Sequence, residues 1–215
     1  MYLAFLVEEQ SMVEALRNLI PKILPDCLQY DIYSHNGKPD LLRKLPQRLR
    51  AFHSFLPADA AIIIIVDKDN DDCKALKIRL EQIAEQAGFV TKTKAPDGNF
   101  QVLTRLAITE LEAWFLGDMA AINAVYPKVN PDLHLKAKYR NPDEISHAWE
   151  ELERILQKAG YHKGGLPKVK VAGEISAHMV PERNNSYSFK IFCQGLLAII
   201  KRPQLEVWMN DCSSP

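Results

Sequence analysis

The sequence predicts an α/β protein, with a mainly parallel sheet flanked by helices and a mainly helical C-terminal part. Short apolar runs alternate with amphipathic helical patterns through the first half of the chain. The run at residues 60–66, AAIIIIV, is uniformly apolar and rich in β-branched residues, as is typical of a central parallel strand covered on both faces. This alternation favours right-handed crossovers, which leave helices on both faces of the sheet.

The first strand and helix follow from apolar spacing. Residues 2–7 form a short apolar run that predicts a buried strand. Ser11 and Glu14 have the S-x-x-E spacing of a capping box, which predicts a helix from this point to near Pro25.

The next elements repeat the alternation up to the middle of the chain. Residues 28–33 read as a second strand, and residues 41–55 as a basic amphipathic helix kinked near Pro46. The helix after AAIIIIV closes at Gly88, which suits the position just beyond a helix end. Residues 101–108 are expected to form a further strand.

The second half reads as mainly helical. A helical stretch beginning at Glu110 is recapped at Asp118, and another helix is predicted from Asn141 to Gly160. Residues 161–188 have no clear period and predict either a long functional loop or a small helical cap, before an apolar helix at 189–200. We therefore expect an α/β core over residues 1–125 and a helical extension over 126–215, packed on that core.

Composition limits the class of protein. The chain has 215 residues, of which 47% are hydrophobic and 25% charged, which suits one sizeable core. No apolar run is long enough to cross a bilayer, the N-terminus does not resemble a signal peptide, and the four cysteines are scattered. We expect a cytoplasmic protein without membrane association. The formal net charge is zero, so any binding to nucleic acid must come from local basic patches.

Acidic residues follow two of the predicted strands. Glu8 and Glu9 follow the first strand, and Asp67 and Asp69 follow AAIIIIV. The carboxyl ends of parallel strands meet at one edge of a sheet, so these carboxylates should lie together. Carboxylate oxygens are the ligands that Mg²⁺ or Mn²⁺ accepts, which predicts a divalent metal site formed by Glu8, Asp67 and Asp69.

The acids around Asp67 and Asp69 also match two other patterns. Asp71 and Asp72 are better explained as caps of the following helix. An EF-hand loop is excluded, because it needs Gly at its sixth and Glu at its twelfth position, where this chain has Asp72 and Ile78.

Several longer motifs resemble a known family. The segments LVEEQSMVEAL, IIIIVDKDND and ITELEAWFLGD, with GYHKG and SYSFKIF further on, resemble the bacterial family called domain of unknown function 4276. A strand ending in Glu and a later strand ending in D-x-D also resemble the Toprim arrangement of topoisomerases, primases and overcoming-lysogenization-defect (OLD) nucleases, a Rossmann-like sheet. One departure is Glu9, where such families usually have Gly.

The resemblance implies an activity and a set of residues. Toprim enzymes cut or join phosphodiester bonds with Mg²⁺, which would make Glu8 the proton-handling or metal-binding glutamate and Asp67 and Asp69 the metal-binding pair. Lys163, beside two glycines, is a candidate for reaching the scissile phosphate and neutralising developing charge, as a lysine does in OLD-type nucleases, against an exposed loop position. Toprim effectors of this sort often work in defence systems with a separately encoded AAA or ABC-type ATPase.

Secondary candidates come from the other motifs. Glu112 is an additional candidate metal ligand, against a helix-start role through the helix dipole. Arg183 is a candidate substrate-binding residue, against an exposed loop position. Trp114 and Phe115 are expected in the core rather than as base-stacking platforms, and His178 at the surface. The basic runs at 43–50 and 136–140 suit either a nucleic-acid backbone or a solvated helix face.

Three functions compete at this point. The first is a Mg²⁺-dependent nuclease acting on DNA or RNA, and the second a non-catalytic Toprim-fold module that binds a partner protein or nucleic acid. The third, a phosphoacceptor receiver-like domain, fits poorly because of the D-x-D and the long C-terminal half. A homodimer is left open, and no nucleotide-binding P-loop motif is present to encode ATP hydrolysis.

Overall fold

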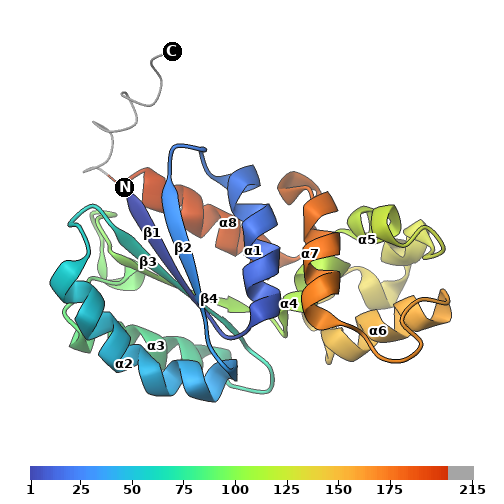
Figure 1. The fold of residues 1–215 in the computed structure, drawn as a ribbon, viewed down its shortest axis with the longest axis horizontal. Coiled ribbons are helices and arrows are strands. Elements are labelled where there is room, and N and C mark those ends of the chain that lie inside the picture. Colours follow the sequence, from blue (N-terminus) through green and yellow to red (C-terminus); the bar gives the residue numbers. More distant parts are fainter. Residues whose placement is uncertain (203–215) are drawn as a thin grey trace, which may run out of the picture.

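The computed structural model describes residues 1–202 and has a four-stranded parallel sheet at its centre (Figure 1). The strand order is β2-β1-β3-β4, so β1 and β3 are the central strands. Their register sets Val7 beside Ile65, which brings the ends of both strands to one edge. The strands are β1 (Tyr2–Val7), β2 (Gln29–Ser34), β3 (Ala61–Asp67) and β4 (Val102–Ala107). The predicted α/β class is confirmed.

Helices cover both faces of the sheet. Side chains alternate along a strand, so Phe5 and Ile63 face one apolar cluster while Leu6 and Ile64 face another. The first cluster includes α1 and α8, and the second includes α2 and α3 (Figure 1). These helices are α1 (Gln10–Ile23), α2 (Gly37–Phe55), α3 (Cys73–Gln86) and α8 (Tyr187–Ile200).

The part of the chain after β4 is mainly helical, as predicted, and packs beside α1 (Figure 1). Asn18 Nδ2 donates to Gly173 O and to Ser176 Oγ, both at 2.9 Å, which fixes α7 along α1. Its α-helices are α4 (Leu111–Leu116), α5 (Met119–Val125), α6 (Ala148–Lys158) and α7 (Lys168–His178). Short 3-10 turns are η1 (Lys92–Lys94), η2 (Pro131–Leu135), η3 (Ala137–Tyr139), η4 (Pro142–Glu144) and η5 (Pro181–Arg183).

Two predicted helix starts are wrong. Glu9 rather than Ser11 is the N-cap residue of α1, and Ser11 lies buried in the first turn, donating to Glu9 Oε1 at 2.7 Å. The helix predicted from Asn141 begins only at Ala148. Asp143, which lies within the predicted helix, instead accepts from the backbone N–H of Ser188 at 2.7 Å and so holds the start of α8.

Other predicted boundaries are confirmed. Asp72 caps α3 by accepting from the backbone N–H of Ala75 at 2.7 Å, and Gly88 follows that helix with a positive φ of 91°. Asp118 caps α5. The 161–188 segment contains α7, so the helical-cap alternative is the one observed.

One apolar core connects the two predicted parts of the chain. The cluster on the α1 face of the sheet runs from Leu3 through Trp114 and Ile175 to Ile199 without interruption. Trp114 and Phe115 lie inside it, 0% and 1% exposed, which confirms their predicted core role. The division near residue 125 is therefore bridged by shared packing.

Candidate functional site

Three acidic residues lie at the carboxyl edge of the sheet. Glu8 directly follows β1, Asp67 is the last residue of β3, and Glu112 lies in the first turn of α4, which follows β4. Parallel pairing of β1 with β3 and of β3 with β4 brings all three chain segments to the same edge. We call Glu8, Asp67 and Glu112 the carboxylate cluster.

Glu8 is fixed by the neighbouring strand. The backbone N–H of Asp67 donates to Glu8 Oε1 at 2.8 Å, and the Glu8 residue is only 9% exposed. Burial raises the pKa of Glu8 to about 7, although the Asp67 amide and the charge of Lys38 act in the opposite direction. The Glu8 carboxyl can therefore take up or release a proton near neutral pH.

Asp67 has the least satisfied side chain of the cluster. Its Oδ1 atom is buried and has no hydrogen-bond partner among residues 1–202, although the residue as a whole is half-buried. Burial, followed by the charges of Glu112 and Glu8, raises the pKa of Asp67 well above its ordinary value. A buried carboxylate oxygen in this position needs either a proton or a cation.

Glu112 completes the cluster from the helical side. It is 4% exposed, and burial raises its pKa to about 7 against the lowering effect of Lys168. Lys168 stands in the first turn of α7, with its Nζ 4.3 Å from the centre of the Trp149 ring. A cation that sequence reasoning missed therefore faces the cluster from α7.

Asp69 forms an ion pair with Lys38. Lys38 Nζ donates to Asp69 Oδ2 and to Asp71 Oδ2, both at 2.8 Å, and its own side chain is only 11% exposed. Asp69 has a positive φ of 48°, so the chain turns sharply after Lys68 instead of staying extended. The ion pair also replaces the capping role predicted for Asp71. Lys38 follows the end of β2, so its position at the same edge of the sheet could be predicted from the strand order.

The donor atoms of the cluster suit a divalent cation, but the side chains are too far apart to bind one as they stand. Within residues 1–202, no three His, Cys, Asp or Glu side chains converge closely enough to hold a metal ion. The donors are nevertheless all carboxylate oxygens, the type that Mg²⁺ prefers, and one of them, Asp67 Oδ1, is buried without a partner. Glu8, Asp67 and Glu112 would hold the cation, and Asp69 could join them only by leaving Lys38.

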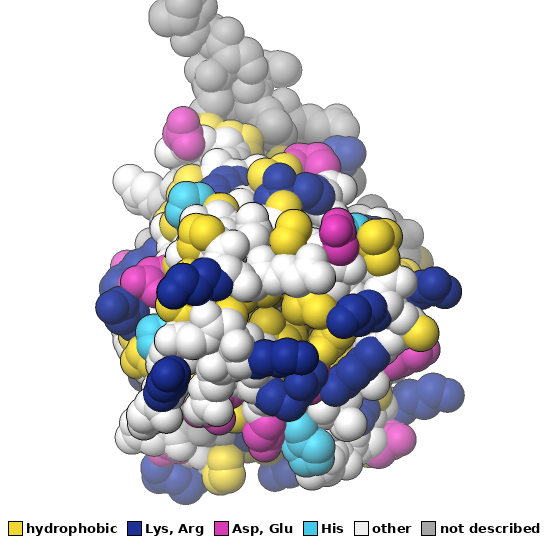
Figure 2. Space-filling view, turned by 90° about the vertical axis from the view of Figure 1, so that its right-hand side faces the viewer, with side chains coloured by type: hydrophobic (Ala, Val, Ile, Leu, Met, Phe, Trp, Pro, Cys, Tyr) yellow, Lys and Arg dark blue, Asp and Glu magenta, His cyan; other side chains and the backbone are white. Residues whose placement is uncertain are grey.

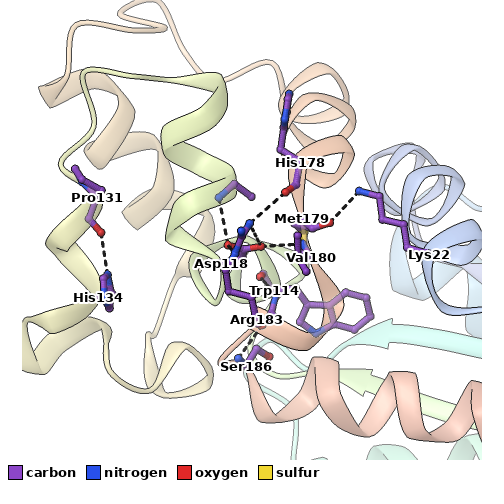
Figure 3. A network of polar contacts seen from close by, with 12 residues as sticks. Lys22, Trp114, Asp118, Pro131, His134, His178, Met179, Val180, Arg183 and Ser186 are labelled. Atoms are coloured by element: carbon purple, nitrogen blue, oxygen red, sulfur yellow. Dashed lines mark hydrogen bonds and ion pairs between the residues drawn. The ribbon is translucent and has the colours of Figure 1, made fainter.

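The two predicted basic site residues lie in different surroundings. Lys163 is exposed in the connection between α6 and α7, and its side chain makes no hydrogen bond or ion pair within residues 1–202. Arg183 donates to both carboxylate oxygens of buried Asp118, from Nε at 2.7 Å and from Nη2 at 2.9 Å (Figure 3). Arg183 thus holds α5 against the segment before α8, and the structure does not bring it to the carboxylate cluster.

Two depressions flank the loop that carries Asp69. One, of about 780 Å³, lies between α2 and α3 and is lined by Lys38, Arg43, Asp71 and Arg79 among others. The second, of about 430 Å³, is lined by Lys68, Asp69, Asn70, Thr109, Glu110, Ser146 and His147. Both open beside the carboxyl edge, so a ligand larger than an ion has room there.

Comparisons with known proteins identify a family. No described helix, within residues 1–202, is long and apolar enough to span a membrane. Neither a curated protein nor a solved structure matches the chain. The sequence profile described as "Domain of unknown function (DUF4276)" matches residues 7–197, which is most of the chain. The chain therefore belongs to the DUF4276 family.

Proposed function

We propose that the protein is a Toprim-like, Mg²⁺-dependent enzyme that cleaves phosphodiester bonds in nucleic acid. The single observation that carries the proposal is the buried, unpartnered Oδ1 of Asp67, set between two further carboxylates with raised pKa values. Three buried acids in mutual repulsion destabilise a fold unless they bind a proton or a cation. Such clusters are typical of functional sites rather than of structural ones.

The residues divide the chemistry among them. A bound Mg²⁺ would polarise a phosphate oxygen and lower the charge cost of attack at phosphorus. Where Asp67 and Glu112 hold the cation, Glu8, whose pKa lies near neutrality in the metal-free protein, would accept the proton removed from the attacking water. Lys168, which already lowers the pKa of Glu112, would offset negative charge developing on the phosphate. Lys163 is a further candidate for that role, because its loop carries Gly164 and Gly165 and is exposed.

A non-catalytic module is the second candidate function. Lys38 neutralises Asp69 and Asp71 with short ion pairs, as acids in a purely structural role would require. Glu9, by contrast, does not count against catalysis. It has an ordinary extended backbone and its side chain is used by Ser11, so glycine is not needed at that position.

Metal binding separates the two candidates. Calorimetric titration with Mn²⁺ should show binding to the wild-type chain and its loss in Asp67→Asn. The matched control is Asp97→Asn, because Asp97 is an exposed aspartate remote in sequence from the cluster. Absence of Mn²⁺ binding in the wild type would contradict the enzymatic proposal and favour the non-catalytic module.

Cleavage assays complete the test. Plasmid, linear DNA and tRNA are incubated with the wild type, Asp67→Asn and Lys168→Gln in Mg²⁺ or Mn²⁺. We expect activity to disappear in Asp67→Asn and to fall at least tenfold in Lys168→Gln. Activity that persists in Asp67→Asn would place the chemistry elsewhere. The defence-system setting and a separate AAA or ABC-type ATPase partner belong to the same proposal, and co-purification with the product of a neighbouring ATPase gene would test them.

A further inference from the structure

A basic groove lies on the helical part of the chain, apart from the carboxylate cluster. It has a volume of about 480 Å³ and runs between the η2–η3 segment and the C-terminal half of α6. Figure 2 looks onto the helical end of the molecule and shows Lys and Arg side chains around a central apolar patch. The groove's apolar floor includes Val129 and Ile155, and its cations are Lys128, Lys136, Lys138, Arg154 and Lys158.

No acidic side chain lines this groove among residues 1–202. The nearest carboxylate, Glu151, is buried, 7% exposed, and lies beneath two of the cations. Lys138 Nζ donates to Glu151 Oε2 at 2.6 Å, and Arg154 Nη2 donates to Glu151 Oε1 at 2.5 Å. Glu151 therefore offsets part of the charge of that pair while fixing the positions of both side chains.

The Arg154 guanidinium keeps donors to spare. Its Nε and Nη2 atoms bind Glu151 and the Tyr139 hydroxyl, while Nη1 has no acceptor among residues 1–202. A guanidinium held in place on one side presents its remaining N–H groups in a fixed direction, which suits a phosphate oxygen.

Three lysines of the groove carry uncompensated charge. Lys128, Lys136 and Lys158 are exposed, and in the described part of the chain none of them forms a salt bridge. Three such charges and two anchored ones around a single groove attract a polyanion, despite the zero formal net charge of the chain.

The helix α6 connects this groove with the edge that carries the cluster. At its start, the backbone N–H of Trp149 donates to Glu110 Oε2 at 2.7 Å, two residues before Glu112. At about 1.5 Å per residue, α6 extends about 14 Å from Trp149 to Lys158. This length corresponds to about four phosphates along one strand of B-form DNA.

We propose that this groove binds the phosphate backbone of a nucleic acid several nucleotides from the bond held at the carboxylate cluster. The identity of the polyanion rests on the proposed function. The contacts expected are to phosphates, because the groove offers several cations and only one aromatic wall, the buried Tyr139.

Salt-dependent binding tests the proposal. Fluorescently labelled 20-nucleotide single strands and 20-base-pair duplexes are titrated with the full chain in EDTA, at several salt concentrations. The test variant is Lys128→Gln/Lys136→Gln/Lys158→Gln, and the matched control is Lys94→Gln/Lys190→Gln/Lys201→Gln, since those three lysines are also exposed. Melting temperatures confirm that both variants are folded.

We expect the test variant to bind more weakly and its salt dependence to become shallower. Each lost phosphate contact removes about 0.9 from the slope of log affinity against log salt for a duplex, and about 0.7 for a single strand. The three substitutions together should lower the slope by about 2 to 3. A fall with only one of the two probes would support the groove and identify its substrate as single- or double-stranded.

Three results would contradict the proposal that this groove binds nucleic acid. They are no nucleic-acid binding by the wild type, an unchanged slope in the test variant, and an equal fall in the control variant. Failure of the proposed function is distinguishable, because EDTA removes metal from the binding assay. If the slope changes as expected but the protein neither binds Mn²⁺ nor cleaves nucleic acid, the groove proposal stands and the enzymatic proposal is wrong.

Discussion

The backbone N–H of Asp67 donates a 2.8 Å hydrogen bond to Glu8 Oε1, joining the ends of the two central strands. One carboxylate is thereby satisfied by the backbone of its neighbour, while the side-chain Oδ1 of that neighbour is left without a partner in residues 1–202. This asymmetry leaves Asp67 Oδ1 as the oxygen of the cluster that has no partner to offset its charge.

Asp67→Asn should stabilise the metal-free protein. The substitution removes a charge that is both buried and repelled by Glu112 and Glu8. At pH 8 in EDTA we expect the free energy of unfolding to rise by about 1–2 kcal/mol, the usual size of a single stabilising substitution. Urea denaturation measures it. Asp97→Asn, at an exposed position, should change the free energy of unfolding by less than about 0.5 kcal/mol. Destabilisation by Asp67→Asn would contradict the repulsion inferred between Asp67 and the two glutamates.

The stability of the metal-free protein should fall as the pH rises from about 4.5 to about 7. Glu8 and Glu112 have an ordinary pKa of 4.5 and a folded-state pKa of about 7, so the folded state binds more protons in this window. Each protonated carboxyl stabilises the folded state by on the order of 3 kcal/mol. This contribution is fully present below about pH 4.5 and is lost as the pH rises above about 7. Urea denaturation in EDTA at pH 5 and pH 8 measures the difference.

The double variant Glu8→Gln/Glu112→Gln is the control for this pH dependence. Because it has no proton to lose at either position, its unfolding free energy should change less between pH 5 and pH 8, and the remaining change is attributed to Asp67, whose pKa is also raised by burial. Glu151, whose pKa is lowered to about 2 by its Arg154, Lys138 and Tyr139 partners despite burial, titrates below the window. A wild type equally stable at both pH values would refute the assignment of raised pKa values.

Arg183→Gln should destabilise the fold without changing Mn²⁺ affinity. It removes the bidentate partner of Asp118, whose side chain is 0% exposed, although the arginine itself is 46% exposed. We expect a loss of about 2–4 kcal/mol, below the upper end for buried pairs because of that exposure. Arg17→Gln breaks an exposed pair with Glu14 and should cost less than about 1 kcal/mol. Weakened Mn²⁺ binding in a folded Arg183→Gln protein would contradict this prediction and indicate that Arg183 contributes to the candidate site.

Gly117→Ala should destabilise the protein through a steric clash. A Cβ atom at this position would lie 2.2 Å from Asn184 Oδ1 and 2.9 Å from the backbone nitrogen of Ser186. Asn184 cannot simply withdraw, because its Nδ2 donates to Trp114 O at 2.7 Å in the buried interior. A loss of about 1–3 kcal/mol is expected from thermal denaturation. Gly164→Ala, which meets nothing within 4 Å, is the matched control and should be close to neutral.

The sequence determines the sheet and the position of the acids well. AAIIIIV predicts a buried central strand, and the convergence of parallel strand ends then brings Glu8 and Asp67 together without further information. Glu112 could be proposed because its motif follows β4. Local patterns suffice in these cases, because topology alone sets which edge each residue occupies.

Contacts between side chains that are far apart in the sequence could not be predicted from local sequence patterns. The sequence predicts Asp69 as a partner of Asp67, but it does not reveal the ion pair of Asp69 with Lys38, 31 residues away. Arg183 is predicted from the sequence to bind substrate, and its pairing with Asp118, 65 residues distant, is not visible there. α7 was missed as a definite helix because Gly173 and several lysines interrupt the apolar spacing of Val171, Ala172 and Ile175.

The interlocking of α1 with α7 limits how the chain can be shortened. Lys22 Nζ donates to the carbonyl oxygens of Ser176, Ala177 and Met179 at 2.7–2.9 Å, and the apolar cluster beneath is continuous from Leu3 to Ile199. A fragment ending at residue 125 would expose the buried side of α1 to water and leave its lysine without acceptors. Such a fragment should aggregate on expression, so gene fusions and deletions should spare everything through Arg202, which donates to Phe100 O at 2.6 Å.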